Sequence, residues 1–369
     1  MTPRRTHLVN LRIPGPIPVD DEILHTMSSP MINHRGPEFE ELLYGVTEGL
    51  KKVFSTNNDL YIITGSGTSA MEAAVVNTLS PNDTAINATV GVFGNRFGII
   101  GRNYGVKVVE LAFPFGSAVD LNLLRKCLDD NPATKAVMVT HNETSTGVTN
   151  DLEAIAKVVK GEYKKLLLVD GISSVCSIPI ETDQWGIDVA TSASQKGWML
   201  PPGLAFITFS KEAWEAHEQS NMPKFYLDVA EYQRYYEIGQ PPFTPSLSCM
   251  FALETALQRI LTEGLESVYQ RHVNIGQHTR KNIKELGLDL FPISDDIASN
   301  TCTAIKVPKE VDGGALIKEL RETHKIVLAG GQSTLSGKIF RIGHMGLTDQ
   351  KDIDEVVNAL SKVLPTLYQ

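Results

Sequence analysis

Short apolar runs alternate with helical patterns along the first two thirds of the chain. Several runs are apolar at nearly every position, as in strands that are buried on both faces of a sheet. They occupy residues 60–64, 84–90, 106–112, 136–140, 166–170, 188–192 and 204–209. Because strands alternating with helices are typical of sheets covered on both faces, the pattern predicts an α/β fold with a mainly parallel, seven-stranded sheet.

Apolar side chains also recur at helical spacing before the first run. They begin just after Pro37 and are Phe39, Leu42, Leu43, Val46, Leu50 and Val53. Residues spaced in this way share one face of a helix, and such a stripe is typical of a helix packed on a core. We therefore interpret it as core and not as part of a ligand site.

The last third of the chain has a different pattern. A predicted helix over about 246–263 follows Pro241 and Pro242, and short strands are expected near 301–307, 326–328 and 338–343. No Gly/Ser-rich linker marks a domain boundary. We expect an N-terminal arm over residues 1–20, a large domain over 21–265 and a smaller α+β C-terminal domain over 266–369.

Composition narrows the class of protein. The chain has 369 residues, of which 42% are hydrophobic and 21% charged, enough for one large core and a smaller second one. A net charge of −9 without a basic stripe argues against a nucleic-acid partner. No apolar run approaches the roughly 18 residues of a membrane span, and no apolar segment follows the basic residues 1–7 as in a secretory signal. We expect a cytoplasmic protein without a membrane partner.

The four cysteines, Cys127, Cys176, Cys249 and Cys302, are widely spaced and form no C-x-x-C pair. This spacing suggests neither a zinc site nor a disulfide scaffold. We expect no bound metal and reduced thiols, which agrees with a cytoplasmic location.

Lys196 is the first candidate for chemistry. It lies in Ser194-Gln-Lys-Gly197, just past a predicted strand, and Asp170 ends another apolar run 26 positions earlier. Pyridoxal phosphate needs both groups, an amine that forms a Schiff base and a carboxylate that keeps the pyridine nitrogen protonated. Taken singly, each residue has an ordinary interpretation, a solvated lysine or a capping aspartate.

A glycine-rich turn, Thr64-Gly-Ser-Gly-Thr-Ser69, separates an apolar run from an apparent helix over Ala70–Asn77. Glycines let the backbone approach an anion, and the first N–H groups of a helix point at it, so a phosphate fits there. A tight turn that binds nothing is the alternative. The spacing matches neither G-x-G-x-x-G nor a Walker loop, which argues against a dinucleotide or a nucleoside triphosphate.

Further motifs extend over nearly the whole chain. They are Ile13-Pro-Gly-Pro16, His34-Arg-Gly-Pro-Glu-Phe39, Gly65-Ser-Gly-Thr-Ser-Ala-Met-Glu72, Gly91-Val-Phe-Gly-Asn-Arg96, His141-Asn-Glu-Thr-Ser-Thr-Gly147, Val169-Asp-Gly-Ile-Ser-Ser174, Ser194-Gln-Lys196, Pro201-Pro-Gly203, Phe243-Thr-Pro245 and Phe340-Arg-Ile-Gly343. In these motifs the chain resembles the class V aminotransferases of pyridoxal phosphate fold type I, and most closely the alanine/serine–glyoxylate aminotransferase group. The resemblance implies pyridoxal 5'-phosphate as cofactor.

The resemblance implies roles for several residues around the cofactor. Ser66, Gly67 and Thr68 would hold the phosphate, with Gln195 beside them. In this family Thr244 reaches the phosphate of the neighbouring subunit, which implies a homodimer with shared active sites. Some members carry a Tyr three residues before that Thr; Pro241 stands there in this chain, so one phosphate contact is missing or comes from another residue.

Four residues would surround the cofactor ring. Phe93 would stack on the pyridine, although an ordinary core Phe is the alternative. Asp170 would pair with the ring nitrogen, Ile172 would pack under the opposite face, and Thr144 would donate a hydroxyl near the ring or its 3′-oxygen.

Substrate contacts are also implied. Arg341, within the apolar run 339–342, resembles the family's clamp for the substrate α-carboxylate, and Gly15 would lie beside the substrate. His34 and Arg35 lie at the dimer interface in similar enzymes, although a solvated loop is nearly as good an interpretation. Gln332-Ser-Thr334 either lines the substrate entrance or forms a plain surface turn.

We expect a ping-pong aminotransferase that moves an amino group from alanine or serine to glyoxylate or pyruvate. Lys196, as a free amine, would move the proton between the substrate Cα and the cofactor C4′. Related enzymes use aspartate, phosphonate or ureidoglycine substrates, which stay open alternatives.

Two other classes were weighed. A pyridoxal-dependent lyase or cysteine desulfurase shares the fold, but desulfurases place a His before the Lys, where Gln195 stands, and a Cys on a mobile loop, whereas Cys302 lies in a predicted strand. A catalytically silent binding protein is the third hypothesis. Retention of Asp170, Lys196 and Arg341 together argues against it.

Overall fold

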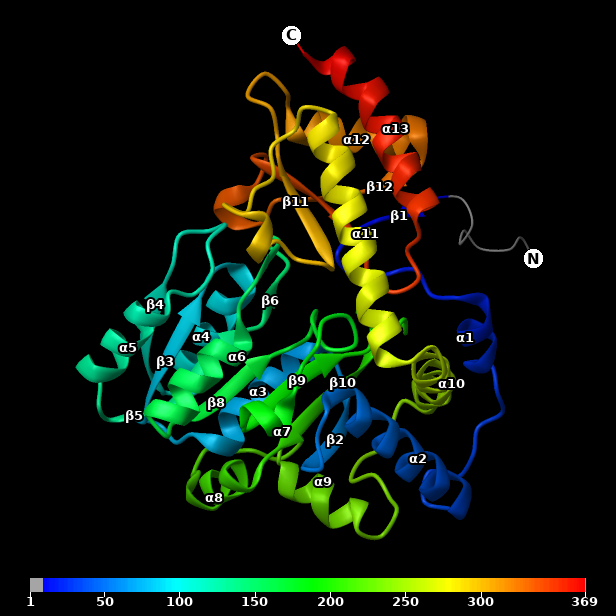
Figure 1. Ribbon diagram of the computed structural model, residues 1–369. Coiled ribbons are helices and arrows are strands. Elements are labelled where there is room, and N and C mark those ends of the chain that lie inside the picture. Colours follow the sequence, from blue (N-terminus) through cyan, green and yellow to red (C-terminus); the bar gives the residue numbers. More distant parts are fainter. Residues whose placement is uncertain (1–8, 369) are drawn as a thin grey trace.

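A computed structural model describes residues 9–368, so the basic residues 1–7 lie outside the described residues. The large domain is built on a seven-stranded sheet with the order β2-β10-β9-β8-β5-β3-β4 (Figure 1). Its strands are β2 (Asp59–Gly65), β3 (Thr84–Thr89), β4 (Lys107–Ala112), β5 (Thr134–Thr140), β8 (Leu166–Asp170), β9 (Val189–Ala193) and β10 (Gly203–Phe209). Only β10 runs antiparallel to its neighbours, so the prediction of a mainly parallel seven-stranded sheet is confirmed.

Helices cover both faces of this sheet. They are α2 (Pro37–Phe54), α3 (Gly67–Thr78), α4 (Val92–Asn103), α5 (Leu121–Asp130), α6 (Leu152–Ala156), α7 (Thr182–Trp185), α8 (Lys211–Gln219), α9 (Val229–Tyr236) and α10 (Leu247–Glu263). Alternate residues of β5 belong to different cores: Val137 and Val139 lie in the cluster that also contains residues of α2 and α10, whereas Ala136 and Met138 lie in the cluster that contains residues of α3 and α4. Burial on both faces explains the apolar runs of the central strands, whereas the edge strand β4 has only exposed and partly buried residues.

Two predicted helices begin slightly earlier than expected. The apolar stripe of α2 is buried as predicted, and Pro37 is itself the first helical residue, where proline is favoured because its missing N–H has no intrahelical partner. Helix α3 begins at Gly67 and not at Ala70, with Ser66 in extended geometry as its N-cap. The second half of the glycine-rich turn, from Gly67 on, therefore forms the first turn of the helix, whereas Thr64 and Gly65 end β2.

The small domain follows α10. Its elements are α11 (Leu265–Glu285), β11 (Cys302–Lys306), α12 (Gly313–His324), β12 (Ile326–Val327), β13 (Ala329–Gly330), β14 (Ile339–Gly343) and α13 (Gln350–Leu367). Strands β11, β14 and β13 form an antiparallel sheet in that order, and α11, α12 and α13 pack on it. The predicted short strands near 301–307, 326–328 and 338–343 are confirmed. The domain boundary at residue 265 and the arm over residues 1–20 stay predictions.

The N-terminal part of the described chain touches both domains. It contains β1 (Asn10–Leu11), which pairs in parallel with β12 of the small domain, and then α1 (Asp21–Thr26), which packs on α10. A second short pair, β6 (Asn142–Glu143) and β7 (Val148–Thr149), forms a hairpin beside the main sheet. Strands of two residues are too short to produce a readable alternation, which explains why the sequence did not predict β1, β6 and β7.

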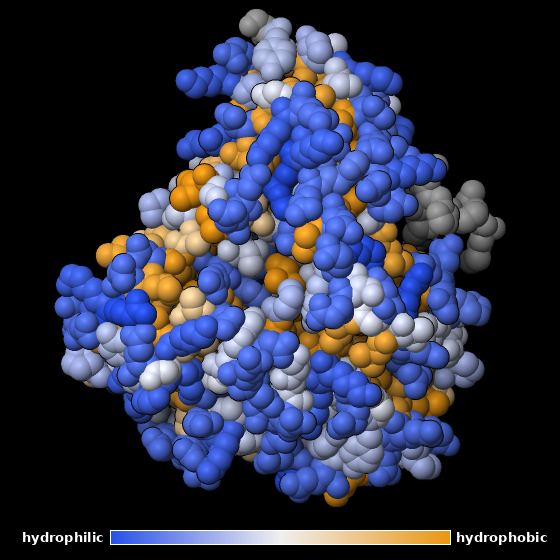
Figure 2. All heavy atoms as spheres, in the orientation of Figure 1, coloured by the Kyte–Doolittle hydropathy of each residue, from blue (hydrophilic) through white to orange (hydrophobic). Residues whose placement is uncertain are grey.

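The visible face of the molecule is mainly hydrophilic, with smaller hydrophobic patches between polar areas (Figure 2). Among residues 9–368, no helix combines the length and apolar character needed to cross a membrane. The four cysteines are all free thiols.

Candidate active site

The sequence-predicted residues gather at one edge of the large sheet. Strand β8 ends at Asp170, and Lys196 follows the neighbouring strand β9 by three residues. The next strand, β10, pairs with β2 so that Gly203 lies opposite Gly65, at the start of the glycine-rich turn. Carboxyl ends of parallel strands meet at the same edge, where α/β proteins bind ligands. The fold thus brings the lysine, the aspartate and the glycine-rich turn together.

Lys196 is held by the N-terminal segment. Its Nζ donates a hydrogen bond to the carbonyl oxygen of Pro14 at 2.6 Å. Gly15 lies directly against the lysine, since a Cβ at this glycine would come within 2.5 Å of Nζ, and its φ of +134° also disfavours other residues. The predicted contact of Gly15 with the substrate stays a prediction.

Burial makes the Lys196 amine easier to deprotonate. It lowers the pKa of Lys196 to about 8, and the positive charges of Arg341 and Arg96 act in the same direction, whereas Cys302 and Asp170 oppose it. The ordinary pKa of lysine lies near 10.4. A larger fraction of the amine is therefore neutral near physiological pH, as a nucleophile and a proton acceptor require.

Asp170 is 3% exposed and keeps two hydrogen bonds. Its Oδ1 accepts from the backbone N–H of Ile172 at 2.9 Å, and its Oδ2 accepts from the Thr140 hydroxyl at 3.3 Å. Burial raises the pKa of Asp170 to about 6, and the charge of Glu143 adds to this. Buried Asp188 has Lys160 as ion-pair partner at 2.7 Å, but the described part of the chain gives Asp170 no such cation within 4.0 Å. A buried carboxylate needs a cationic partner, and a protonated pyridine nitrogen would supply one to Asp170.

The phosphate turn also offers unused donors. Gly67 and Thr68 are the first residues of α3, where backbone N–H groups lack intrahelical partners, and the Ser66 side chain makes no capping hydrogen bond. The side-chain oxygen of Gln195 is also buried without a partner, but it is an acceptor, so only the side-chain NH₂ group of Gln195 is able to donate to a phosphate. Ile172 packs against Gly67, where a Cβ would come within 2.6 Å of its Cδ1. These residues fit the phosphate end of pyridoxal phosphate.

Glu143 positions Phe93, and the sequence did not reveal this contact. The Glu143 carboxylate is fully buried and accepts from the backbone N–H groups of Phe93 at 3.0 Å and Gly94 at 2.9 Å, in the first turn of α4. Ser145 donates to the other carboxylate oxygen through its N–H and its hydroxyl. An anion at a helix N-terminus is favourable. Phe93 itself is only partly buried, unlike an ordinary core Phe, and Arg96 lies over its ring at 4.9 Å.

Arg341 lies in β14 and is 5% exposed. Its Nη1 donates to the carbonyl of Thr144 at 3.0 Å, while Nε and Nη2 donate to the carbonyl of Gly330 at 3.1 and 2.7 Å. Among the described residues no carboxylate forms an ion pair with Arg341, so its positive charge is available to an anion. The Thr144 contact uses the carbonyl; the predicted role of the Thr144 hydroxyl stays a prediction.

His141 is a further residue that the sequence did not single out. It is buried, its Nδ1 has no hydrogen-bond partner, and burial lowers its pKa to about 4. Its backbone N–H donates to the carbonyl of Asp170 at 2.9 Å. A neutral imidazole with a free nitrogen beside the aspartate suits a site that receives a polar ligand.

The other predicted residues differ in exposure and contacts. Thr244 is exposed, and Pro241 is buried in the same stretch. Arg35 donates to the side chain of Gln240 at 2.9 Å, so the loop that carries it packs on this stretch of its own chain. The side-chain oxygen of Gln332 is buried without a partner, two residues beyond the Gly330 carbonyl that binds Arg341.

The lowered pKa of Lys196, the buried Asp170 carboxylate without an ion-pair partner among residues 9–368, and the unpaired charge of Arg341 fit an enzyme that uses pyridoxal phosphate. The family model for class-V aminotransferases matches residues 21–356. The chain belongs to the class-V aminotransferase family and is a pyridoxal-phosphate-dependent transaminase. The resemblance read from the motifs is confirmed.

Relatives match over nearly the whole chain. A protein described as the small subunit of a soluble hydrogenase, from Synechococcus sp. (strain PCC 6716), is 41% identical over 97% of this chain and 93% of its own. The L-aspartate–glyoxylate aminotransferase of Paracoccus denitrificans is 35% identical over 94% of this chain and 89% of its own. The crystal structure of an alanine–glyoxylate aminotransferase from Nostoc sp. is similar with a TM-score of 0.94 and 31% identity, over 99% of this chain and 97% of that chain.

Proposed function

We propose that the enzyme transfers an amino group from a small L-amino acid, alanine or serine, to glyoxylate or pyruvate in a ping-pong cycle. The observation that carries the proposal is the geometry of Arg341. Its guanidinium is held in place by two backbone carbonyls and has no carboxylate partner among residues 9–368. A planar cation in this setting suits bidentate binding of an α-carboxylate.

The residues of this chain have distinct roles in the proposal. Pyridoxal phosphate supplies an electron-accepting ring when bound. Lys196 removes and returns the proton at the substrate Cα, and Asp170 holds the ring nitrogen. Phe93 and Ile172 would hold the ring between them, and the Thr144 hydroxyl would donate to it. Ser66, Gly67, Thr68 and Gln195 bind the phosphate.

Aspartate is the second candidate donor, and Arg96 is the observation that favours it. Arg96 is partly exposed and lies over the ring of Phe93. Its positive charge lowers the pKa of Lys196, as does the charge of Arg341. A second cation near the site could bind a side-chain carboxylate. The Paracoccus relative, whose name gives aspartate as donor, supports the same alternative.

A desulfurase activity receives no support from Cys302. This residue lies in β11, as predicted, and is fully buried. Burial raises the pKa of its thiol to about 11, and its Sγ donates weakly to the Thr144 carbonyl at 3.8 Å. A nucleophilic cysteine has a lowered pKa and an accessible position.

We further propose that two copies share their active sites and that the enzyme acts in the cytoplasm. Near exposed Thr244, an apolar pocket is lined by Tyr226, Phe243 and Pro241, and Phe225 is 75% exposed nearby. Large exposed aromatics beside an apolar pocket are typical of a protein interface. Four free thiols agree with a reducing compartment.

The test is the visible absorbance of the purified holoenzyme, recorded after L-alanine, L-serine or L-aspartate and then after glyoxylate. The proposal expects the cofactor band to bleach with alanine or serine and to return with glyoxylate. Bleaching by aspartate alone would favour the second candidate. A yellow protein that responds to none of the three would overturn the donor assignment.

A further inference from the structure

The segment Asn10–Ile17, here called the strap, joins the small domain to the catalytic lysine. It starts as β1 on the edge of β12. The backbone N–H of Arg12 donates to the Val327 carbonyl at 2.9 Å, and its carbonyl accepts from the Gly343 N–H at 2.7 Å. Arg12 is therefore held between β12 and β14, and β14 also carries Arg341.

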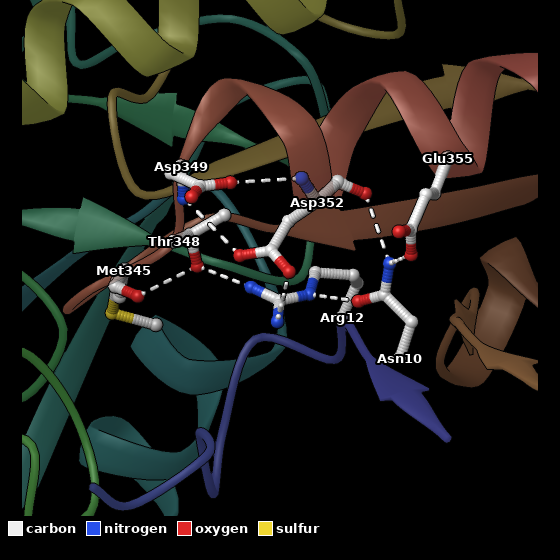
Figure 3. Close-up of polar contacts among 7 residues, drawn as sticks. All are labelled: Asn10, Arg12, Met345, Thr348, Asp349, Asp352 and Glu355. Carbon is white, nitrogen blue, oxygen red and sulfur yellow. Dashed lines mark hydrogen bonds and ion pairs between the residues drawn. The ribbon is translucent and has the colours of Figure 1, made fainter. Parts of the chain in front are cut away.

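The side chain of Arg12 fastens the strap to the start of α13 (Figure 3). Its Nη1 donates to the Thr348 hydroxyl at 2.6 Å, its Nη2 pairs with Asp352 Oδ1 at 3.2 Å, and its Nε contacts the side-chain oxygen of Asn10. Arg12 is 7% exposed. Because the planar guanidinium uses all three nitrogens, its orientation is fully determined.

The partners of Arg12 are themselves held in place. The other oxygen of Asp352 accepts from the Asp349 N–H at 3.1 Å, and the two aspartates form a reciprocal cap on α13. The Thr348 hydroxyl donates to the Met345 carbonyl at 3.0 Å, and the Asn10 amide donates to the Asp352 carbonyl at 2.9 Å (Figure 3). The groups that bind Arg12 are thus hydrogen-bonded to other parts of the structure.

The far end of the strap encloses Lys196. Pro14 supplies the carbonyl that accepts from Lys196 Nζ at 2.6 Å, and Gly15 lies against the amine. The Ile17 N–H then donates to the Gln195 carbonyl at 3.3 Å, and the Ile17 side chain is buried. Only one residue separates Arg12 from Pro14, so a shift of the Arg12 backbone also moves the Pro14 carbonyl that accepts the hydrogen bond from Lys196.

We propose that Arg12 is a positioning residue for Lys196. By fastening the strap to α13, it keeps the Pro14 carbonyl and the Gly15 backbone against the amine, which directs the amine and shields it from water. The proposal rests on Lys196 as the catalytic lysine and is independent of which amino donor the enzyme uses.

Positioning matters most while the amine is free. Lys196 must then stay in place to move a proton, although a lysine side chain has much rotamer freedom to lose. An acceptor on a flexible loop would leave that freedom in place. An acceptor on a strap bonded to two strands and one helix removes it.

Arg12→Gln tests the proposal in the full-length chain. The cofactor-free protein is acylated from about pH 6 to about pH 11 with a limiting reagent, and modification of Lys196 is followed by peptide mass spectrometry. Burial is the main cause of the lowered pKa of Lys196, so this pKa should rise when the variant admits water to the amine. The pH at which labelling of Lys196 is half complete should then move upward, toward the value for exposed lysines. Amide hydrogen exchange over residues 13–17 should accelerate about tenfold or more.

Turnover of the reconstituted enzyme gives a separate readout. We expect kcat to fall about tenfold with KM changing less than about twofold, because the substrate clamp stays intact. Asp352→Asn, which removes the ion pair but keeps an oxygen for the α13 cap, should give the same changes in weaker form. Arg12→Lys, which keeps the charge without the planar fork, should recover only part of the loss.

Arg125→Gln is the matched control, since Arg125 forms a two-pronged pair with Glu162 on the surface of the large domain. It should change none of these readouts. A lowered melting temperature of Arg12→Gln and Asp352→Asn with unchanged Lys196 labelling, strap exchange and kcat would show a purely structural role and overturn the proposal. Labelling needs neither cofactor nor substrate, so a wrong donor assignment would not alter this outcome.

Discussion

At the residue scale, the chemistry of the site depends on a lysine placed where its charge is unfavourable. Burial lowers the pKa of Lys196 to about 8 in the folded chain, whereas an unfolded lysine titrates near 10.4. Below pH 8 both states are protonated, and the folded state bears the full cost of the buried charge. As pH rises from about 8 to about 10.4 the folded amine loses its proton first, so this cost disappears.

Lys196→Met should therefore abolish transamination and yet stabilise the cofactor-free protein. At pH 7 the gain in unfolding free energy should reach at most about 3 kcal/mol, from the size of the pKa change, and it should shrink between about pH 8 and about pH 10. Chemical denaturation at a series of pH values measures it, with Lys126→Met on the surface as control. Full turnover of the Lys196 variant would end its assignment as the catalytic lysine.

Arg341 gives a second prediction at this scale. Arg341→Ala should lower kcat/KM for α-amino acids about thirty-fold or more, equivalent to about 2–4 kcal/mol for a charge-assisted bidentate contact, mainly through KM. Steady-state kinetics with alanine, serine and aspartate measure it. Arg102→Ala, which removes an exposed arginine paired with Glu110, serves as control. Unchanged kcat/KM for every carboxylate donor would exclude Arg341 as the clamp.

The site residues that we predicted from the sequence have chemical roles that few other residue types are able to perform. Lys196 and Asp170 were singled out because each follows an apolar run, as an amine for the aldehyde and a carboxylate for the ring nitrogen, and Arg341 because the family resemblance implied a guanidinium for a carboxylate. Glu143 and Arg12 were not, since their partners lie 50 and 336 positions away. Nothing local distinguishes such residues from surface charges.

At the element scale, the start of α4 depends on one buried carboxylate. Glu143 accepts from the N–H groups of Phe93 and Gly94 with one oxygen and from Ser145 with the other. Glu143→Gln would turn one of these acceptors into an NH₂ group that faces N–H donors. Buried donors left without acceptors cost about 1–3 kcal/mol each.

We expect Glu143→Gln to lower both stability and cofactor affinity, the latter by about tenfold, because Phe93 loses its orientation. Titration of the cofactor-free protein with pyridoxal phosphate measures the affinity, and thermal unfolding measures the stability. Glu110→Gln, whose side chain bonds Asn87 and Arg102 near the other end of the same helix, is the control. A loss of stability with unchanged cofactor affinity would show that Glu143 supports the fold but not cofactor binding.

Elements differed in how well the sequence predicted them. The central strands of the large sheet were readable because helices bury both faces, which requires apolar residues at successive positions, whereas the edge strand β4 has no buried residue. The first turn of α3 was missed because Gly67 has poor helix propensity, and its packing against Ile172 outweighs that propensity. Two-residue strands such as β1 gain their stability from partners distant in sequence, which no local pattern reveals.

At the scale of the whole molecule, each part of the site comes from a different region of the chain. The large domain supplies Lys196 and Asp170, the small domain supplies Arg341, and the strap crosses between them to Lys196. Thr244 is exposed and lines a pocket together with Thr64, which opens the glycine-rich turn. If its phosphate contact is made in the neighbouring subunit, a complete site needs two chains.

Hybrid dimers test this arrangement. A Lys196→Ala chain has no working lysine, and a Thr244→Ala chain should bind the cofactor weakly. In a hybrid of the two, one site combines the intact lysine of one chain with the intact threonine of the other, whereas the second site lacks both. When equal amounts of the two chains pair at random, about half of the dimers are hybrids, and each hybrid has one complete site. About a quarter of all sites should therefore bind the cofactor tightly and be active when the cofactor concentration is too low to fill the weak sites. If Thr244 served the phosphate of its own chain, no site of the hybrid would be complete, and mixing would restore nothing.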